Sequence, residues 1–341
     1  MYCSAPFTRF LVTVSGDVYL CYGSHWIAGA TGNLLASDPM DIWRGANAAR
    51  LRDSIVDQSF RYCTDCRCPE LIEVRMPPEH VATDWIGHLA LCYDPTCNIA
   101  CPSCRTVNKK ADETTARIHQ VLLSSGILKH VKVISTSGAG EPLASTYFWD
   151  LITRLPELGC LPDIGVILTT NGLLLTPKTL AKVLDTGVKL LGIEISVDAA
   201  TKETYAINRG GNWDRLLDNL LHLQGSGIPL RLNFVVQENN FKEIPQFAHL
   251  AFSFGVSTVR FDALNNWGSY ERQEYQRRAI HKKDHPRHEE LKVVLQHSIL
   301  RDSRVELAQL SDEFMNLGSP LATIHKISTR SQVKNLTRGV K

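Results

Sequence analysis

Between residues 86 and 264 the sequence alternates short apolar runs with helical patterns, and this alternation restricts the possible folds more than any other feature. Each run is rich in Val, Ile, Leu or Phe and is bounded by turn-forming or polar residues, as β-strands are. The predicted strands are 86–93, 131–135, 164–168, 192–197, 230–236 and 258–264. A chain with this rhythm is typical of the α/β class.

Between the predicted strands, apolar residues recur every three or four positions, which is the period of an amphipathic helix. One such stripe consists of Phe148, Leu151, Ile152 and Leu155. Thr176 followed by Pro177 predicts a helix start, because Thr caps free amide groups and Pro lacks one. Repeated strand–helix units predict parallel strands joined by right-handed crossovers. Periodicity alone leaves open whether the sheet stays open or curls into a partial barrel.

Three cysteines, spaced Cys-x3-Cys-x2-Cys, follow the first predicted strand within one short loop. They are Cys97, Cys101 and Cys104. Thiolates on such a loop can bind one face of a cubane iron–sulfur cluster and leave a fourth iron open to a substrate. Zinc is the competing metal, but structural zinc sites require four protein ligands. Cys92 is a candidate fourth ligand, which we interpret instead as a small buried residue on a strand.

The loop DPTCNIACPSCR resembles the signature of the radical S-adenosylmethionine (SAM) superfamily, and the resemblance covers about residues 85–265. It implies a (β/α)6 partial TIM barrel, a SAM-ligating 4Fe-4S cluster on the three cysteines, and SAM as a second cofactor. The residue before the third cysteine is usually aromatic in this family and is Ser103 here, which affects local packing rather than ligation. The variant CNIACPSC is similar to that of family members with an additional cluster domain.

A glycine-rich acidic motif, residues 137–142, follows the second predicted strand. Gly138 and Gly140 would allow the backbone to approach a ligand closely, and the Glu141 carboxylate can accept hydrogen bonds from an ammonium group. By resemblance, this motif binds the amino group of SAM. Without the cysteine loop beside it, the same motif would indicate only a tight turn. Its position at the carboxyl end of a parallel strand favours ligand contact.

Later strands end in further polar residues that the resemblance assigns to the SAM pocket. Thr170 and Asn171 would shape the pocket, and they also suit a turn before a capped helix. Ser196 and Asp198 flank one residue and therefore point to the same side; the resemblance implies contact with the SAM ribose or carboxylate. Arg209 is a candidate for a bidentate contact with the methionyl carboxylate.

A second group of cysteines lies near the amino terminus. It consists of Cys3, Cys21, Cys63, Cys66 and Cys68. With the surrounding turns, residues 1–70 resemble the auxiliary-cluster module called SPASM, or its shortened twitch form, which in most family members follows the barrel. The resemblance implies an auxiliary 4Fe-4S cluster on Cys3, Cys21, Cys63 and Cys68, with Cys66 as the alternative to Cys68. A structural zinc knuckle remains the competing interpretation.

Three units are expected along the chain: the auxiliary-cluster module at 1–80, the radical SAM core at 83–265 and a partly helical carboxy-terminal extension at 266–341. In the extension, His281, His285 and His288 have spacings typical of metal ligands. Pro286 and the surrounding charges instead favour a solvated linker or helix start.

The whole chain has 341 residues and a net charge of +2, which argues against a broad nucleic-acid surface. Membrane spans need about 18 consecutive apolar residues, and we expect none here. We expect no signal peptide either, because the first residues lack a basic segment followed by an apolar block. Clustered cysteines without such a signal indicate a reducing compartment, hence a cytoplasmic protein with metal-binding thiols.

The resemblance implies an enzyme that reductively cleaves SAM to methionine and a 5′-deoxyadenosyl radical, which abstracts hydrogen from a substrate. A reductant such as flavodoxin or ferredoxin would supply the electron, and the substrate would be a peptide, a protein or a small molecule. The alternative from another class is a non-catalytic iron–sulfur electron-transfer or binding protein. Such a protein has no need of the polar motifs after the second, third and fourth strands.

Overall fold

The computed structural model of the chain describes residues 2–23, 26–64, 86–105, 107–136, 138–160 and 164–311. At its centre is a ten-stranded sheet in the order β10-β9-β8-β7-β6-β5-β4-β1-β2-β3. Its six central strands pair in parallel and coincide with the six predicted ones. They are β4 (His88–Cys92), β5 (Val133–Thr136), β6 (Gly165–Thr170), β7 (Lys189–Ser196), β8 (Leu230–Val236) and β9 (Thr258–Ala263).

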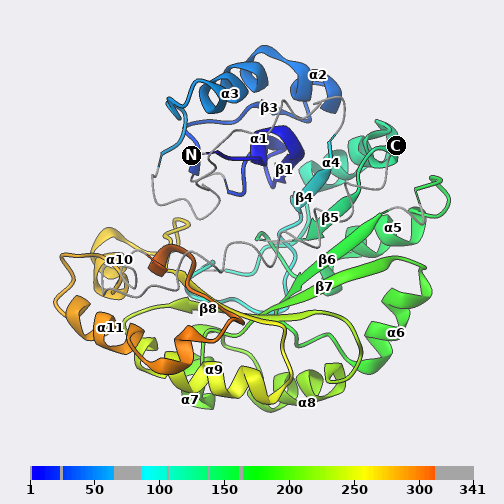
Figure 1. Cartoon of the computed structure of the whole chain (residues 1–341). Helices are drawn as coiled ribbons and strands as arrows, with labels where there is room; N and C mark the ends of the chain where they lie inside the picture. Colours follow the sequence, from blue (N-terminus) through cyan, green and yellow to red (C-terminus); the bar gives the residue numbers. More distant parts are fainter. Residues whose placement is uncertain are drawn as a thin grey trace.

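Helices connect these strands on the outer side of the curved sheet (Figure 1). They are α4 (Glu113–Ser124), α5 (Thr146–Arg154), α6 (Pro177–Asp185), α7 (Lys202–Asn208), α8 (Trp213–Leu223) and α9 (Ile244–Ser253). The side-chain hydroxyl of Thr176 accepts a hydrogen bond from the backbone amide of Thr179. The helix start predicted at Thr176 and Pro177 is therefore confirmed. Short 3-10 turns complete the connections at η2 (Ile127–Lys129), η3 (Pro142–Ala144) and η4 (Phe241–Glu243). The (β/α)6 partial barrel expected from the resemblance is therefore present, and it is not closed.

The amino-terminal residues extend this sheet rather than standing apart from it. Their elements are α1 (Ala5–Thr8), β1 (Arg9–Thr13), β2 (Asp17–Tyr19), β3 (Gly32–Asn33), α2 (Pro39–Arg44) and α3 (Ala46–Val56). Strand β1 pairs in parallel with β4 along its whole length, from Arg9 opposite His88 to Thr13 opposite Cys92. Because directly paired residues face the same side of a sheet, the inner face of the barrel continues onto β1.

The carboxy-terminal segment adds a strand at the opposite edge of the sheet, where β10 (Val305–Glu306) pairs in parallel with β9. Its other elements are α10 (Arg272–Arg278), α11 (His288–Leu295), η5 (Ser298–Arg301) and η6 (Ala308–Leu310). The helix start predicted at the three histidines is confirmed, because α11 begins at His288. The solvated linker is wrong, because all three side chains are buried. The imidazole of His285 bonds the carbonyl of Arg277 at 2.9 Å, and that of His288 bonds the carbonyl of Ile280 at 3.1 Å. These two imidazoles bond backbone carbonyls at the end of α10 and in the turn that follows it, which the charged neighbours in the sequence did not indicate.

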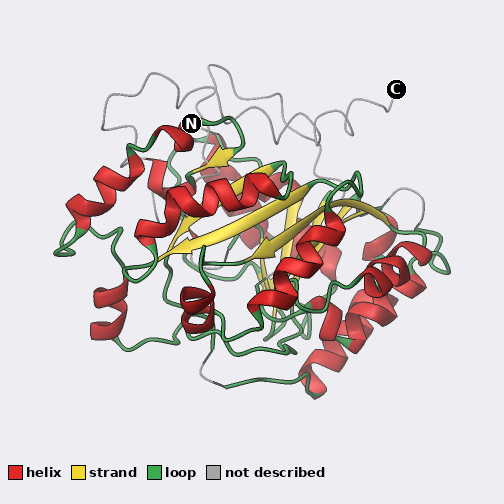
Figure 2. Ribbon diagram, turned by 90° about the horizontal axis from the view of Figure 1, so that it is seen from below, coloured by secondary structure: helices red, strands yellow, loops and turns green. Residues whose placement is uncertain are grey.

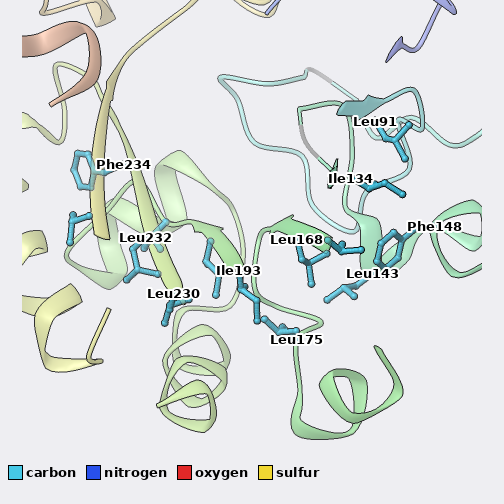
Figure 3. Close-up of a cluster of buried hydrophobic side chains, with 14 of the residues drawn as sticks. Leu91, Ile134, Leu143, Phe148, Leu168, Leu175, Ile193, Leu230, Leu232 and Phe234 are labelled. Atoms are coloured by element: carbon cyan, nitrogen blue, oxygen red, sulfur yellow. The ribbon is translucent and has the colours of Figure 1, made fainter. Parts of the chain in front are cut away.

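The main apolar core lies between the sheet and its outer helices, as Figure 2 shows by the layer of helices around the strands. Figure 3 shows Leu168, Ile193 and Leu232, from three neighbouring strands, in this core. Along β8, buried residues alternate with half-buried ones such as Arg231 and Asn233. The half-buried set faces the inner side of the partial barrel, which is therefore polar. Among the described residues, none of the helices is both long and apolar enough to traverse a bilayer.

Candidate functional site

The cysteine loop begins directly after β4 and folds into a tight turn. The thiol of Cys101 is buried, and Cys97 and Cys104 are half-buried. The amides of Cys104 and Arg105 both donate to the carbonyl of Cys101, at 2.9 and 3.0 Å. Within the described ranges, no three His, Cys, Asp or Glu side chains gather around a position for one metal ion. A cubane cluster requires a wider arrangement, since each thiolate binds a different iron.

The glycine-rich loop after β5 packs against this cysteine loop. The amide of Glu141 donates to the carbonyl of Thr96 at 2.7 Å. A Cβ on Gly140 would lie 2.4 Å from that carbonyl oxygen and 2.5 Å from the carbonyl oxygen of Asp94. At Gly140 the close backbone approach is therefore to the cysteine loop itself, and the predicted approach of these glycines to a ligand stays a prediction.

Arg105 ties the same two loops together, and the sequence analysis assigned it no role. Its guanidinium donates to the carbonyl of Pro95 at 2.7 Å and to the carbonyl of Ala139. It also lies 3.3 Å from the sulfur of Cys104. A cation immediately after the third cysteine was the available signal, because a thiolate ligand is stabilised by a neighbouring positive charge.

The side chain of Glu141 points into the protein and is 2% exposed. Its carboxylate accepts hydrogen bonds from the hydroxyl of Thr170 and the backbone amide of Asn171, each at 2.6 Å. It accepts a third from the backbone amide of Leu143 at 3.2 Å. Burial raises the pKa of this carboxyl, although the hydrogen bonds and the charge of Arg209 act in the opposite direction. Glu141 thus joins the loop after β5 to the end of β6.

Replacing Glu141 by Gln is therefore expected to destabilise the fold by about 1–3 kcal/mol, measured by chemical denaturation. In either orientation, the new amide group faces a backbone N–H and leaves that donor without an acceptor. Glu289 provides the matched control, because its side chain is 80% exposed, and Glu289→Gln should be nearly neutral. Equal stabilities for the two variants would contradict the role of Glu141 as a buried link.

Asn171 brings the end of β6 to the cysteine loop. Its side-chain amide donates to Asn98 at 2.7 Å and lies 4.0 Å from the sulfur of Cys97. Asn98 was not singled out in the sequence analysis, although it lies between two of the cysteines. Three of the predicted site residues, Glu141, Thr170 and Asn171, therefore form one bonded group beside the cysteines.

Asp198 and Arg209 form a second group at the end of β7. Asp198 is 1% exposed and has a φ of +59°. Its carboxylate accepts the amide of Val235 at 2.7 Å and pairs with the guanidinium of Arg209 at 3.0 Å. Burial raises the pKa of this carboxyl against the effect of Arg209. Burial would lower the pKa of Arg209, but the charges of Cys101 and Asp198 outweigh it and raise that pKa, so Arg209 lies in the field of the cysteine loop.

Two buried donors near Cys101 have no hydrogen-bond acceptor within the part of the chain that the structure describes. They are the hydroxyl of Tyr205 and the Nε of Arg209. Tyr205 itself is completely buried, and no sequence motif marked it. The predicted Ser196 ends β7 on the inner face and is half-buried, opposite Asn233 of β8. Of these polar groups, Tyr205 and Arg209 lie close enough to Cys101 to interact with it electrostatically.

The described amino-terminal cysteines also lie together. Cys3 belongs to a small buried cluster, and the half-buried Cys63 packs against that cluster. Burial, and then the nearby Cys21, raise the pKa of the Cys63 thiol, so Cys21 and Cys63 are neighbours. Cys66 and Cys68 lie outside the described residues.

Comparisons with known proteins agree with this geometry. A family model for the radical SAM superfamily matches residues 94–251. A model for an iron–sulfur cluster-binding domain, SPASM, matches residues 3–69. The mycofactocin maturase MftC of Mycolicibacterium smegmatis is 29% identical over 175 residues, which are 50% of this chain and 43% of that protein. The AdoMet-dependent heme synthase of Methanosarcina barkeri is 31% identical over 167 residues, covering 47% and 45%.

Among solved structures, Streptococcus suis SuiB bound to its precursor peptide SuiA has a TM-score of 0.49 and 13% identity over 93% of this chain and 75% of that one. The chain spans less than half the length of the two curated relatives named above. The resemblance seen in the sequence is nevertheless confirmed by both family models. Residues 94–251 therefore form a domain of the radical SAM superfamily, and residues 3–69 form a SPASM domain ahead of it.

Proposed function

We propose that this chain is a radical SAM enzyme that reductively cleaves SAM and uses the resulting radical to abstract hydrogen from a substrate. The observation that carries the proposal is the contact between the Gly138–Glu141 loop and the cysteine loop, through Gly140 and Thr96. Ligands of parallel sheets bind at the carboxyl ends of the strands. Both loops, and the ends of β6 and β7, meet at that edge.

The residues around the cysteines suit an anionic iron–sulfur cluster. Arg105 and Arg209 bring two positive charges to Cys104 and Cys101. The free donors on Tyr205 and Arg209 provide hydrogen bonds for a sulfur or for the carboxylate of a bound amino acid. We therefore assign Cys97, Cys101 and Cys104 as ligands of a 4Fe-4S cluster.

When bound, the cluster and SAM supply the one-electron chemistry that yields methionine and a 5′-deoxyadenosyl radical. The chain itself supplies position and exclusion of water. Gly140, which has no side chain, lets its backbone pack against the cysteine loop. Gly138 remains a proposed contact of SAM, and Ser196 offers a hydroxyl from the inner face. Glu141 and Asp198 hold the surrounding loops, because their carboxylates already accept bonds from the protein. Arg209, held by Asp198, remains our candidate for the methionyl carboxylate.

We further propose an auxiliary 4Fe-4S cluster on Cys3, Cys21 and Cys63 with Cys68 or Cys66. The clustering of the first three supports this set. We propose the functional units as 1–80, 83–265 and 266–341. Thiol ligands favour the reducing cytoplasm, where flavodoxin or ferredoxin would serve as the reductant.

The inner face of the barrel favours a polar substrate. Arg231 of β8 pairs with Glu194 of β7 at 3.0 Å and with Glu306 of β10 at 3.5 Å. Arg260 of β9 pairs with Asp262 at 2.9 Å. An apolar substrate would exclude water from these half-buried ion pairs without replacing its hydrogen bonds, which is unfavourable. A peptide and a polar small molecule both meet this requirement.

The direct test uses protein reconstituted anaerobically with iron and sulfide. With dithionite and SAM, the wild type is expected to form 5′-deoxyadenosine and methionine, slowly even without substrate, as measured by chromatography. A protein with a full cluster that binds SAM and forms neither product would contradict the proposed function and favour the electron-transfer alternative.

A further inference from the structure

Arg9 carries a positive charge that is buried at the junction between the amino-terminal module and the barrel. Its exposed fraction is 7%. Among the residues that the structure describes, no carboxylate pairs with it, and its Nε is buried without a hydrogen-bond partner. Burying a charge without a counter-charge is strongly unfavourable, so such a group requires an explanation.

The neighbours of Arg9 do not compensate its charge. Its Nη1 lies 3.2 Å from Nδ1 of His88, and the guanidinium stacks 4.2 Å from the ring centre of Tyr22. Burial, and then the charge of Arg9, lower the pKa of His88 to about 3, so the imidazole is neutral. The other nitrogen of His88 bonds the hydroxyl of Ser135 at 2.8 Å. Arg9 therefore has polar and aromatic contacts but no anion.

The contact with Tyr22 places Arg9 beside the segment that carries Cys21. Strands β1 and β2 are antiparallel, with Leu11 opposite Tyr19. Strand β2 ends at Tyr19, so Cys21 lies two residues beyond it, in the direction of Arg9 at the start of β1. Tyr22, which stacks on the guanidinium, is the next residue. Cys21 in turn neighbours Cys63.

We propose that Arg9 is the counter-charge of the auxiliary iron–sulfur cluster and that its free Nε–H is directed at the sulfur atoms of that cluster. The inference rests on the auxiliary cluster of the proposed function. A cationic donor beside the sulfurs favours the more negative, reduced cluster and so raises its potential. In the metal-free chain the same charge has no counter-charge and destabilises the fold. Replacing Arg9 should therefore have opposite consequences in the two states.

The experiment uses the full chain with Cys97, Cys101 and Cys104 replaced by Ala, so that only the auxiliary cluster remains. Adding Arg9→Met should lower the reduced-to-oxidised ratio at a fixed potential about tenfold, which is about 59 mV for a one-electron couple. Redox titration followed by electron paramagnetic resonance measures this shift. In the metal-free wild-type background, the same substitution should raise the melting temperature. Arg9→Lys, which keeps the charge without the planar donors, should give a smaller shift in potential.

Arg52→Met is the matched control from the same module. Arg52 is also stacked on an aromatic ring, that of Trp43 at 4.3 Å, but it donates to the carbonyls of Pro6 and Trp43 at 2.9 and 2.8 Å. Its loss should lower the melting temperature with or without metal and leave the potential unchanged.

Each contrary result has a distinct meaning. If the iron-loaded chain without the barrel cysteines keeps the same potential after Arg9→Met, only the proposed role of Arg9 is overturned. A carboxylate of the substrate would then be favoured as the partner of Arg9. A lower melting temperature of the metal-free Arg9→Met variant would equally overturn it. If the chain without the barrel cysteines binds no iron, the auxiliary cluster and this inference are both refuted. SAM cleavage by the wild type would not be affected by that result.

Discussion

Simultaneous replacement of Cys97, Cys101 and Cys104 by Ala is expected to reduce 5′-deoxyadenosine formation below detection. In the proposed assignment, each substitution removes the only protein ligand of one iron in the SAM-binding cluster. Iron should fall from about eight to about four atoms per chain, all at the amino terminus. Chromatography of the products and metal analysis of the purified variant measure both effects.

Cys160→Ala is the control for this prediction. Cys160 is 5% exposed, and its thiol contacts the carbonyl of Leu158 at 3.6 Å. Its replacement should leave the iron content and product formation unchanged and should lower the stability of the fold only through lost packing contacts. SAM cleavage that survives the triple replacement would refute the assignment of the barrel cysteines. A triple variant without iron, from a wild type that contains zinc, would instead refute the auxiliary iron–sulfur cluster and support the zinc knuckle.

The elements of the barrel could be predicted from the sequence because their signal is local. An apolar strand such as 230–236, or a capped start such as Thr176–Pro177, is encoded within a few residues. The edges of the sheet could not be predicted in this way. Strand β1 lies 79 positions before its partner, as Arg9 and His88 show, and β10 is two residues long. Their pairing depends on tertiary contacts that leave no period in the sequence.

The candidate site shows the same division. The spacing of the three cysteines and the Gly138–Glu141 motif identify the loops, because each loop is continuous in the chain. The direction of a side chain within such a loop is decided by partners far away. Glu141 turns towards residues 29 and 30 positions later, and Arg105 towards Ala139. For this reason the motif was recognised while its internal bonds, and the contributions of Arg105 and Tyr205, were not.

The second large effect is expected from Gly140→Ala, because the obstacle that the new methyl group meets is backbone. Two carbonyl oxygens lie 2.4 and 2.5 Å from the position of its Cβ. Both belong to the segment that leads into Cys97, so neither can move without displacing the cysteine loop. Overpacking of this kind costs about 1–3 kcal/mol. We expect iron bound at the barrel to fall by more than half and 5′-deoxyadenosine formation to fall at least tenfold, in an order-of-magnitude estimate.

Gly29→Ala separates this steric effect from the general effect of replacing a glycine. Nothing lies within 4 Å of a Cβ at Gly29, so the substitution should leave iron content and product formation unchanged. If Gly140→Ala also kept its iron content and product formation, the glycine-rich loop could shift relative to the cysteine loop without consequence. The contact between them would then be incidental rather than the feature that holds the cysteines in place. Loss of barrel iron in Gly140→Ala, with auxiliary iron retained, would instead tie cluster binding to the backbone contact at Thr96.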